Sequence, residues 1–380
     1  MNPQACFSCS NQGQLVVNLN AVVQNWRNLR QRAGVAECGA VVKANAYGLG
    51  YAPIAKALLR AGCRVFFVAC VAEGCALRAC IDGESTIFVL SGFQGQDAQL
   101  YHEHQLVPVL NSLEQVARWL SAGLGAEPLA VMVDTGINRL GMSLGDIDGL
   151  LQIPGVQSLG LGWVFSHFAC ADEPAHDMNQ LQIEKFESTL NKVRSYFPAA
   201  RASLANTAGL FLPKQCVYQM VRPGIGLYGA SPDPLHPLAA EPVVHLRLPV
   251  LQIRQITEPS YVGYGATQQV PAGTWLATVA GGYADGLMRS LSSNASGRFM
   301  GNAVPLVGRV SMDYCVFDIT QAVPKDVNPE DLSETSIEML GDHQTLDELA
   351  ISAGTLPYEL LTRLGERYQR TYLPVLEERQ

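Results

Sequence analysis

From residue 15 to about residue 235, short apolar runs alternate with longer stretches in which apolar residues recur every three or four positions. The short runs are typical of buried strands, and the longer stretches are typical of amphipathic helices. Strands are predicted at residues 39–43, 65–69, 86–90, 106–110, 129–134, 159–165, 201–205 and 219–222. Helices are predicted at residues 21–33, 51–62, 73–80, 112–123 and 178–197.

Repeated strand–helix units of this kind predict a parallel sheet with helices on its outer faces. Eight such units within about 220 residues favour a (β/α)8 TIM-like barrel. A doubly wound open sheet is the alternative.

The pattern changes after a proline-rich stretch at residues 231–242. The following segment is strand-rich, and helical periodicity returns only near the end of the chain. This predicts a barrel at residues 15–235 and a mostly β domain at residues 236–380, with residues 1–14 as an unassigned extension. Further strands are predicted at residues 243–256, 274–282, 303–308 and 315–320, and helices at residues 345–354 and 356–368.

Charged residues make up only 16% of the 380 residues, and the net charge is −8. The net charge argues against a general nucleic-acid binder, which needs a basic surface. No apolar run is long enough for a membrane helix, and the N-terminus lacks the basic start of a secretory signal. We therefore expect a cytoplasmic protein that does not enter membranes. With so few charged residues, the composition does not show which side chains form the surface or whether part of it is an interface.

Most of the ten cysteines stand among apolar neighbours and are predicted to be buried hydrophobic residues. Cys6 and Cys9 form a CxxC pair, but no second pair follows at the spacing of a zinc site. No metal site is predicted.

Active sites of barrel enzymes lie at the C-terminal ends of the strands. Lys43 stands at such an end after two valines, and burial there would favour its neutral, nucleophilic amine. A lysine that extends to solvent at the rim of the barrel is an equally good interpretation of this context. Asn206, Thr207 and Gly224 follow the last two strands, where barrels often bind phosphate.

A nucleophilic lysine beside a phosphate site fits a ligand that carries both an aldehyde and a phosphate. Pyridoxal 5′-phosphate is such a ligand, and its ring nitrogen needs a protein partner. Arg222, next to the glycine-containing sequence RPGIG, is the candidate. The alternatives are a plain turn at Gly224 and a surface ion pair at Arg222.

These residues carry a resemblance to a known family. The motifs VVKANAYG, DTGINRLG, SHFACAD, LANTAG, VRPGIGLYG, GYGAT, GYADGLMR, GRVSMD and LPYELL follow one another from about residue 15 to residue 370. In this respect the chain resembles the alanine racemases, fold-type III enzymes that use pyridoxal phosphate. The resemblance implies a barrel followed by a β domain. It also implies a head-to-tail homodimer in which each active site takes residues from the β domain of the partner.

The resemblance also implies a role for individual residues. Lys43 matches the Schiff-base lysine and one catalytic base, and Tyr264 matches the opposing base from the other subunit. Arg222 matches the arginine that faces the pyridine nitrogen, and His167 matches the histidine that supports Tyr264. The phosphate cradle is matched by Tyr47, Asn206, Thr207, Gly224, Ile225 and Tyr358. The substrate side and the entry channel are matched by Arg139, Met312, Asp313, Tyr283, Arg289, Arg309 and Asp172.

Racemisation removes a proton from one face of the α-carbon and returns one to the other face, so it needs two opposed bases. Free lysine (pKa ~10.4) and free tyrosine (pKa ~10) are too protonated at neutral pH to be efficient bases. Desolvation is expected to lower the pKa of Lys43, and positive charge on His167 and Arg222 to lower that of Tyr264. Because arginine stays protonated, Arg222 is expected to leave the ring nitrogen unprotonated, which favours racemisation over transamination.

Several positions depart from the pattern of the family. Met132 stands where many relatives have a carbamylated lysine that orients the arginine matching Arg139, and Leu49 replaces a usual histidine. Ser311 and Tyr314 flank the substrate-side pair, so a serine or broad-specificity racemase is the main alternative. A related decarboxylase and a non-catalytic pyridoxal-phosphate carrier fit less well. The pathway is open, because both peptidoglycan precursor synthesis and D-alanine catabolism use this chemistry.

Overall fold

The computed structural model describes residues 12–81, 83–212, 216–233, 238–324, 332 and 335–374. The chain divides into two compact units, each described separately here. Val23–Leu227 form one unit, and the residues up to Val22 join Tyr228 and the rest of the chain in the other. Cys6 and Cys9 lie outside the described residues.

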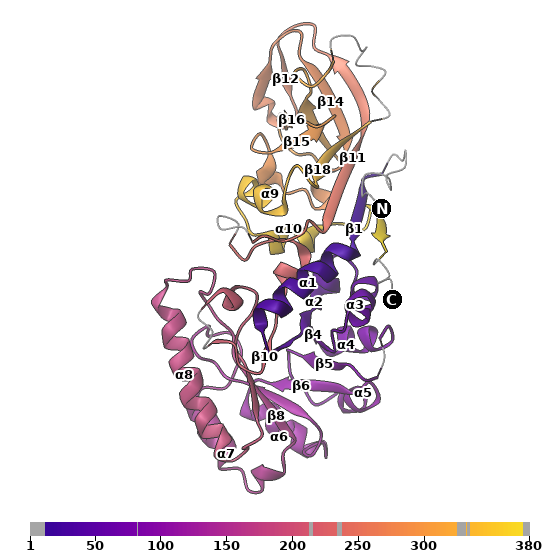
Figure 1. Ribbon diagram of the computed structural model, residues 1–380. Coiled ribbons are helices and arrows are strands. Elements are labelled where there is room, and N and C mark those ends of the chain that lie inside the picture. The colour runs from indigo at the N-terminus through magenta and orange to yellow at the C-terminus, as the bar shows by residue number, and fades with distance from the viewer. Residues whose placement is uncertain are drawn as a thin grey trace. The chain divides into compact units, whose positions relative to one another are not determined.

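The unit of residues 23–227 contains a parallel sheet in which the strands follow one another in chain order (Figure 1). These strands are β3 (Ala40–Val41), β4 (Val65–Val68), β5 (Thr86–Val89), β6 (Leu106–Leu110), β7 (Leu129–Met132), β8 (Leu161–Phe165) and β9 (Arg201–Ser203). A further pair, β10 (Met220–Val221) and β2 (Glu37–Cys38), is also parallel. The amide of Arg222 donates to the carbonyl of Ala205 at 2.9 Å, which links β9 to β10. The predicted (β/α)8 barrel is therefore confirmed.

Helices alternate with these strands, as the apolar periodicity predicts. The helices are α1 (Leu19–Ala33), α2 (Lys43–Tyr47), α3 (Tyr51–Arg60), α4 (Val71–Arg78), α5 (Ala98–Glu103), α6 (Leu113–Ser121), α7 (Leu144–Leu151) and α8 (Asp177–Arg194). Local sequence explains where they begin: Ser143 and Asp146 form a capping box at the start of α7. Between the strands, the rings of Phe67, Phe88 and Phe165 pack with centroids 5.1–5.9 Å apart.

The other unit is built on an eight-stranded sheet and is mostly β, as predicted. Its strands are β1 (Gln14–Asn18), β11 (Val244–Gln255), β14 (Trp275–Ala280), β15 (Ser296–Phe299), β16 (Asn302–Pro305), β17 (Tyr314–Asp318), β18 (Ser336–Leu340) and β19 (Gln369–Leu373). A separate hairpin is formed by β12 (Ser260–Val262) and β13 (Gln268–Val270), and the helices are α9 (Leu346–Ala353) and α10 (Pro357–Arg363).

Strand β1 differs from the predicted domain division. It pairs antiparallel with β11 and parallel with β19, so it belongs to the β unit and not to the barrel, which was expected to begin at residue 15. The side chains of Leu15, Val16 and Val17 are buried by this pairing. A short apolar run predicts a strand, but its composition does not determine which sheet it joins.

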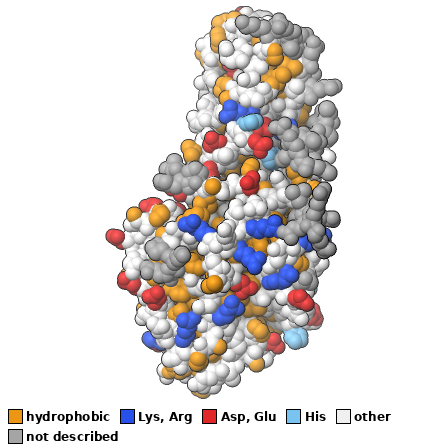
Figure 2. Space-filling model, in the orientation of Figure 1, with side chains coloured by type: hydrophobic (Ala, Val, Ile, Leu, Met, Phe, Trp, Pro, Cys, Tyr) orange, Lys and Arg blue, Asp and Glu red, His pale blue; other side chains and the backbone are white. Residues whose placement is uncertain are grey.

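The distribution of charged side chains and the lengths of the helices bear on the low charge content and on membrane insertion. Figure 2 shows charged side chains in scattered groups, with uncharged surface between them. In the described part of the chain, no helix is both long enough and apolar enough to span a bilayer.

Candidate active site

Lys43 follows strand β3 directly and begins an unusual turn. Residues 44–47 all have positive φ, between 51° and 56°, although none of them is glycine. Left-handed backbone costs an L-residue about 1–2 kcal/mol, so the four together store considerable strain. Backbone strain of this kind concentrates at functional sites.

The electrostatic surroundings of Lys43 match its predicted role. Burial lowers the pKa of Lys43, the positive charge of Arg139 lowers it further, and the negative charge of Glu73 raises it. A lower pKa increases the fraction of neutral amine, which is the form that reacts with a carbonyl group.

Arg222 follows strand β10 and is almost completely buried, with 4% of its surface exposed. Its guanidinium donates to the Ser203 hydroxyl and to the carbonyls of Ser166 and Leu204, and it packs 5.1 Å from the centroid of the Phe165 ring. Burial lowers the pKa of Arg222 to about 9, so the side chain still carries its proton at neutral pH. This buried cation has no carboxylate partner among the described residues, which suits a ligand atom that accepts a hydrogen bond.

His167 follows strand β8, and its Nε2 lies 3.4 Å from Nδ2 of Asn206. Burial and the positive charges of Arg222, Arg139 and Lys43 lower the pKa of His167 to about 3. The imidazole is therefore neutral at pH 7. The predicted effect of the His167–Arg222 chain on Tyr264 stays a prediction. The charge of this pair resides on Arg222.

The predicted phosphate cradle is assembled from the segments that follow β9 and β10. The Thr207 hydroxyl accepts hydrogen bonds from the amides of Gly224 (2.9 Å) and Gly226 (3.4 Å). A methyl group added at Gly224 would lie 2.4 Å from the hydroxyl of Tyr47, so only glycine fits there. Ile225 begins a 3-10 helix, Ile225–Tyr228. Hydroxyls and amides around a glycine are typical of a phosphate site in a barrel.

Arg139 lies in the loop after β7 and is exposed. It forms no hydrogen bond or ion pair with the described residues, yet its charge acts on both Lys43 and His167. An exposed arginine whose guanidinium is not held by an ion pair can bind a carboxylate through two parallel hydrogen bonds. Met132, at the end of β7, has no group that could hold Arg139 as a carbamate would.

A second group of predicted residues meets in the β unit. A pocket of about 730 Å³ is lined by Tyr264, Tyr283, Gly286, Met288, Arg289, Val310, Met312, Asp313 and Arg363. Tyr264 is 69% exposed and lies between Gly263 and Gly265, both of which have positive φ. A methyl group at Gly265 would lie 2.8 Å from the guanidinium of Arg309, so the glycines allow this turn to form.

Hydrogen bonds hold the two loops that line this pocket. The amide of Tyr283 donates to the carbonyl of Ser311 at 3.0 Å, and the amide of Ala284 donates to that of Met312 at 3.0 Å. Arg367 binds both oxygens of Asp285, at 2.7 and 2.8 Å, and an oxygen of Asp313 at 2.7 Å. Arg367 therefore joins the loop of Tyr283 to the loop of Met312 and Asp313.

Comparison with known proteins agrees with this arrangement. Residues 17–232 match the family model "Alanine racemase, N-terminal domain", and residues 243–372 match "Alanine racemase, C-terminal domain". The chain belongs to the alanine racemase family. An alanine racemase of Rhodospirillum rubrum is 43% identical over 371 residues, which cover 96% of each chain. A catabolic alanine racemase of Agrobacterium fabrum is 40% identical over 366 residues, which cover 95% of this chain and 92% of that one.

A solved structure is similar as well. The alanine racemase of Bartonella henselae with covalently bound pyridoxal phosphate superposes with a TM-score of 0.88 at 34% identity, over 96% of this chain and all of that one. The predicted membership of the alanine racemase family and the predicted fold are thus confirmed.

In this alanine racemase chain, the predicted site residues fall into two groups. The barrel brings together Lys43, Tyr47, Arg139, His167, Asn206, Thr207, Arg222, Gly224 and Ile225. The β unit brings together Tyr264, Tyr283, Arg289, Arg309, Met312 and Asp313. Asp172 lies in the barrel unit and is exposed, and Leu49 is fully buried. No cluster of three metal-ligating side chains occurs among the residues that the structure describes.

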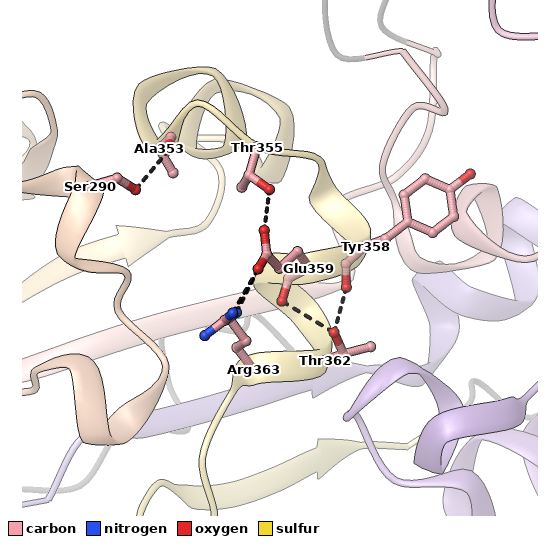
Figure 3. A network of polar contacts seen from close by, with 7 residues as sticks. All are labelled: Ser290, Ala353, Thr355, Tyr358, Glu359, Thr362 and Arg363. Atoms are coloured by element: carbon pink, nitrogen blue, oxygen red, sulfur yellow. Dashed lines mark hydrogen bonds and ion pairs between the residues drawn. The ribbon is translucent and has the colours of Figure 1, made fainter.

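Tyr358 belongs to the β unit, on helix α10. Figure 3 shows its ring pointing away from a network in which Glu359 accepts hydrogen bonds from Thr355 and from Arg363. The Arg363 Nε–Glu359 Oε1 distance is 2.9 Å, and Arg363 also lines the pocket of Tyr264. These hydrogen bonds join side chains on one face of α10, and the ring of Tyr358 extends from a different face.

Sequence reasoning missed two residues that support these groups. Glu73 accepts hydrogen bonds from the amides of Ala44 (2.8 Å) and Ala69 (2.7 Å), and Arg367 joins the pocket loops. An acidic residue in the first turn of a helix has an ordinary explanation in the helix dipole, so Glu73 gave no separate signal. Arg367 lies in a charged segment, GERYQR, whose pattern is typical of an exposed surface.

Proposed function

We propose that this protein interconverts L-alanine and D-alanine, with pyridoxal 5′-phosphate as its cofactor. The observation that carries the proposal is the combination of a half-buried lysine of lowered pKa, a protonated buried arginine and a glycine-lined donor set in one barrel. Agreement with the family along the whole chain supports it.

The barrel residues fit the cofactor. Lys43 would attach its aldehyde carbon, and Arg222 would donate a hydrogen bond to its ring nitrogen. Tyr47, Asn206, Thr207, Gly224 and Ile225 would bind the phosphate. When bound, pyridoxal phosphate withdraws electrons from the α-carbon of the amino acid and makes its hydrogen acidic.

The chain's own side chains then bind the substrate and move the proton. The guanidinium of Arg139 binds the substrate carboxylate. The Lys43 amine takes or returns the proton on one face of the α-carbon, and the Tyr264 hydroxyl acts on the opposite face. Arg222 keeps its own proton throughout, so it stabilises charge by hydrogen bonding without acting as an acid.

The second base comes from another copy of the chain in this proposal. Tyr264, Tyr283 and Met312 line the pocket of the β unit and are 69%, 45% and 53% exposed. Exposed large apolar side chains that lie together mark an interaction surface. We propose a head-to-tail homodimer in which the pocket of Tyr264 covers the barrel site of the partner. Burial of this surface would also help to explain the low charge content, because interface cores are depleted of charge.

Incubation of the purified protein with L-alanine, L-serine and other L-amino acids, followed by chiral chromatography, tests the activity. We expect D-alanine to form fastest. Equal rates with serine would favour the broad-specificity alternative suggested by Ser311 and Tyr314, and absence of every D-amino acid would refute racemisation. Growth experiments distinguish a catabolic from a biosynthetic role, and relatives of about 40% identity include two that are named as catabolic.

Mixing Lys43→Ala and Tyr264→Phe proteins tests the shared site. In a mixed dimer of the proposed kind, one of the two sites has both bases intact, so activity should return to part of its normal level. No recovery after demonstrated subunit exchange would contradict the dimer proposal. Our expectation of a cytoplasmic location stays a prediction.

A further inference from the structure

The turn that carries Lys43 and Tyr47 is held by one carboxylate from a neighbouring strand–helix unit. Strands β3 and β4 are parallel neighbours, and the pairing reaches the amide of Val42, which donates to the carbonyl of Phe67 at 2.9 Å. Beyond this point the amides of Ala44 and Ala69 have no strand partner. Both donate to Glu73, at 2.8 and 2.7 Å, one to each carboxylate oxygen.

Glu73 therefore extends the strand pairing with a side chain. Its position in the first turn of α4 places the carboxylate beside the ends of both strands. Hydrogen bonds from amides to a carboxylate are among the stronger ones in proteins, because the acceptor is charged. The bond to Ala44 acts on the first left-handed residue after Lys43, where the unfavourable backbone conformation begins.

We propose that Glu73 is a positioning residue for the cofactor site: its carboxylate holds the left-handed turn of residues 44–47, and through this turn it orients Lys43 and Tyr47. The inference rests on the proposed use of pyridoxal phosphate. The hydrogen bond from the Ala44 amide to Glu73 lets the carboxylate act on these two side chains through the backbone.

A second effect of Glu73 is electrostatic. The charged groups that act on Lys43 are Arg139, which favours the neutral amine, and Glu73, which favours the ammonium ion, and the neutral His167 lies near them. Removal of the negative charge at residue 73 should therefore lower the pKa of Lys43. A residue with a purely structural role would not change this titration.

The test compares Glu73→Gln with a matched control, Glu114→Gln. Glu114 also occupies the first turn of a barrel helix, α6, but no hydrogen bond joins it to a strand end in the described structure. Glutamine at residue 73 keeps one acceptor oxygen and presents its amide group to the other backbone N–H, so one of the two hydrogen bonds is lost. Loss of a hydrogen bond to a charged group corresponds to about a tenfold effect or more.

Hydrogen exchange of the cofactor-free protein is the first measurement, because it does not depend on activity. We expect one of the two amides, that of Ala44 or that of Ala69, to exchange about tenfold faster in Glu73→Gln than in the wild type or in Glu114→Gln. The second measurement follows attachment of pyridoxal 5′-phosphate to the cofactor-free proteins by visible absorbance across a pH range. Attachment should be about tenfold slower in Glu73→Gln at pH values where Lys43 is neutral in both proteins, and its midpoint should move to lower pH.

The outcomes separate this inference from the proposed function. If wild-type protein does not take up pyridoxal phosphate, or if Lys43→Ala takes it up equally well, the proposed function fails. If the wild type takes it up normally and Glu73→Gln matches Glu114→Gln in both measurements, the role of Glu73 is refuted. If Glu73→Gln does not fold, Glu73→Asp, which keeps the charge but is too short to reach both amides, should fold and show the faster exchange of Ala44 without the change in midpoint. Normal exchange in Glu73→Asp would then refute the positioning role.

Discussion

The two groups of site residues are built in opposite ways. In the barrel, Arg222 is buried without a carboxylate partner, and His167 is kept neutral by burial and surrounding cations. In the β unit, Tyr264 is exposed, and the loops around its pocket are joined by the ion pairs of Arg367 with the carboxylates of Asp285 and Asp313. The barrel group is organised to bind a cofactor that carries negative charge and hydrogen-bond acceptors. The group of the β unit is an exposed surface with its loops held in place, and in the proposed dimer it would cover the barrel site of the partner.

This difference concerns the surroundings of the two proposed bases, Lys43 in the barrel and Tyr264 in the β unit. Burial and the positive charge of Arg139 lower the pKa of Lys43 within a single barrel, against the opposing charge of Glu73. Tyr264 is 69% exposed, so what covers it in the proposed dimer would change its surroundings. The variants described next test this contrast.

Replacement of Lys43 should have the largest effect. Lys43→Ala removes both the attachment point and one base, and we expect racemase activity to fall by more than about 10³-fold. Chiral chromatography measures this loss, and the visible absorbance of attached cofactor should disappear with it. Lys56→Ala, on the exposed face of α3, is the matched control and should retain activity. Equal activity of the two variants would contradict the assignment of Lys43.

Replacement of Tyr264 should have the next largest effect. Tyr264→Phe removes one proton-transfer group, which contributes typically about 10²–10⁴-fold to a rate, while cofactor attachment should be unchanged. Tyr261→Phe is the control, because Tyr261 is also exposed (63%) and lies in the same region of the chain. A small effect at residue 264 would mean that the β unit contributes only shape to the site.

Release of the pocket loops should have a moderate effect. Arg367→Gln breaks the ion pairs to Asp285 and Asp313 and leaves the nearly buried Asp285 without its strongest partner. We expect kcat/KM to fall about tenfold, mainly through KM, since the loss matches one or two charge-assisted hydrogen bonds. Steady-state kinetics measure this, with Arg370→Gln as a control outside the two ion pairs. An unchanged KM would show that the loops do not need Arg367.

Replacement of His167 should have the smallest effect, which is a change in how protein stability depends on pH. The unfolded chain protonates this histidine near pH 6.5, whereas the folded protein does so only near pH 3. Between these values the unfolded state binds more protons, so stability is lost as the pH falls below 6.5. The contribution is about 1.4 kcal/mol per pH unit. Urea unfolding should therefore show a shallower loss of stability between pH 6.5 and 5 in His167→Gln than in the wild type.

The exposed His102 provides the control for that measurement. His102→Gln should follow the pH dependence of the wild type. If His167→Gln follows it as well, His167 is protonated in the folded protein and the description of the barrel group as a site with a neutral histidine is wrong.

The sequence by itself determined the order of strands and helices in the barrel and placed Lys43, Asn206 and Arg222 at strand ends. It could do so because buried strands need continuous apolar runs, and because parallel strands bring their C-terminal ends to one edge. The motifs also determined the family, since they lie in one order along nearly the whole chain.

Only the tertiary structure decided the rest. Strand β1 joins a sheet whose other strands come more than two hundred residues later, and local apolar pattern contains no information on that pairing. The neutral state of His167 depends on its burial and on the charges of Arg222, Arg139 and Lys43, which come from three other segments. The reach of Glu73 to Ala44 depends on the geometry of two neighbouring strand ends. Charge and hydrogen bonding act through space, so these properties exist only after the chain has folded.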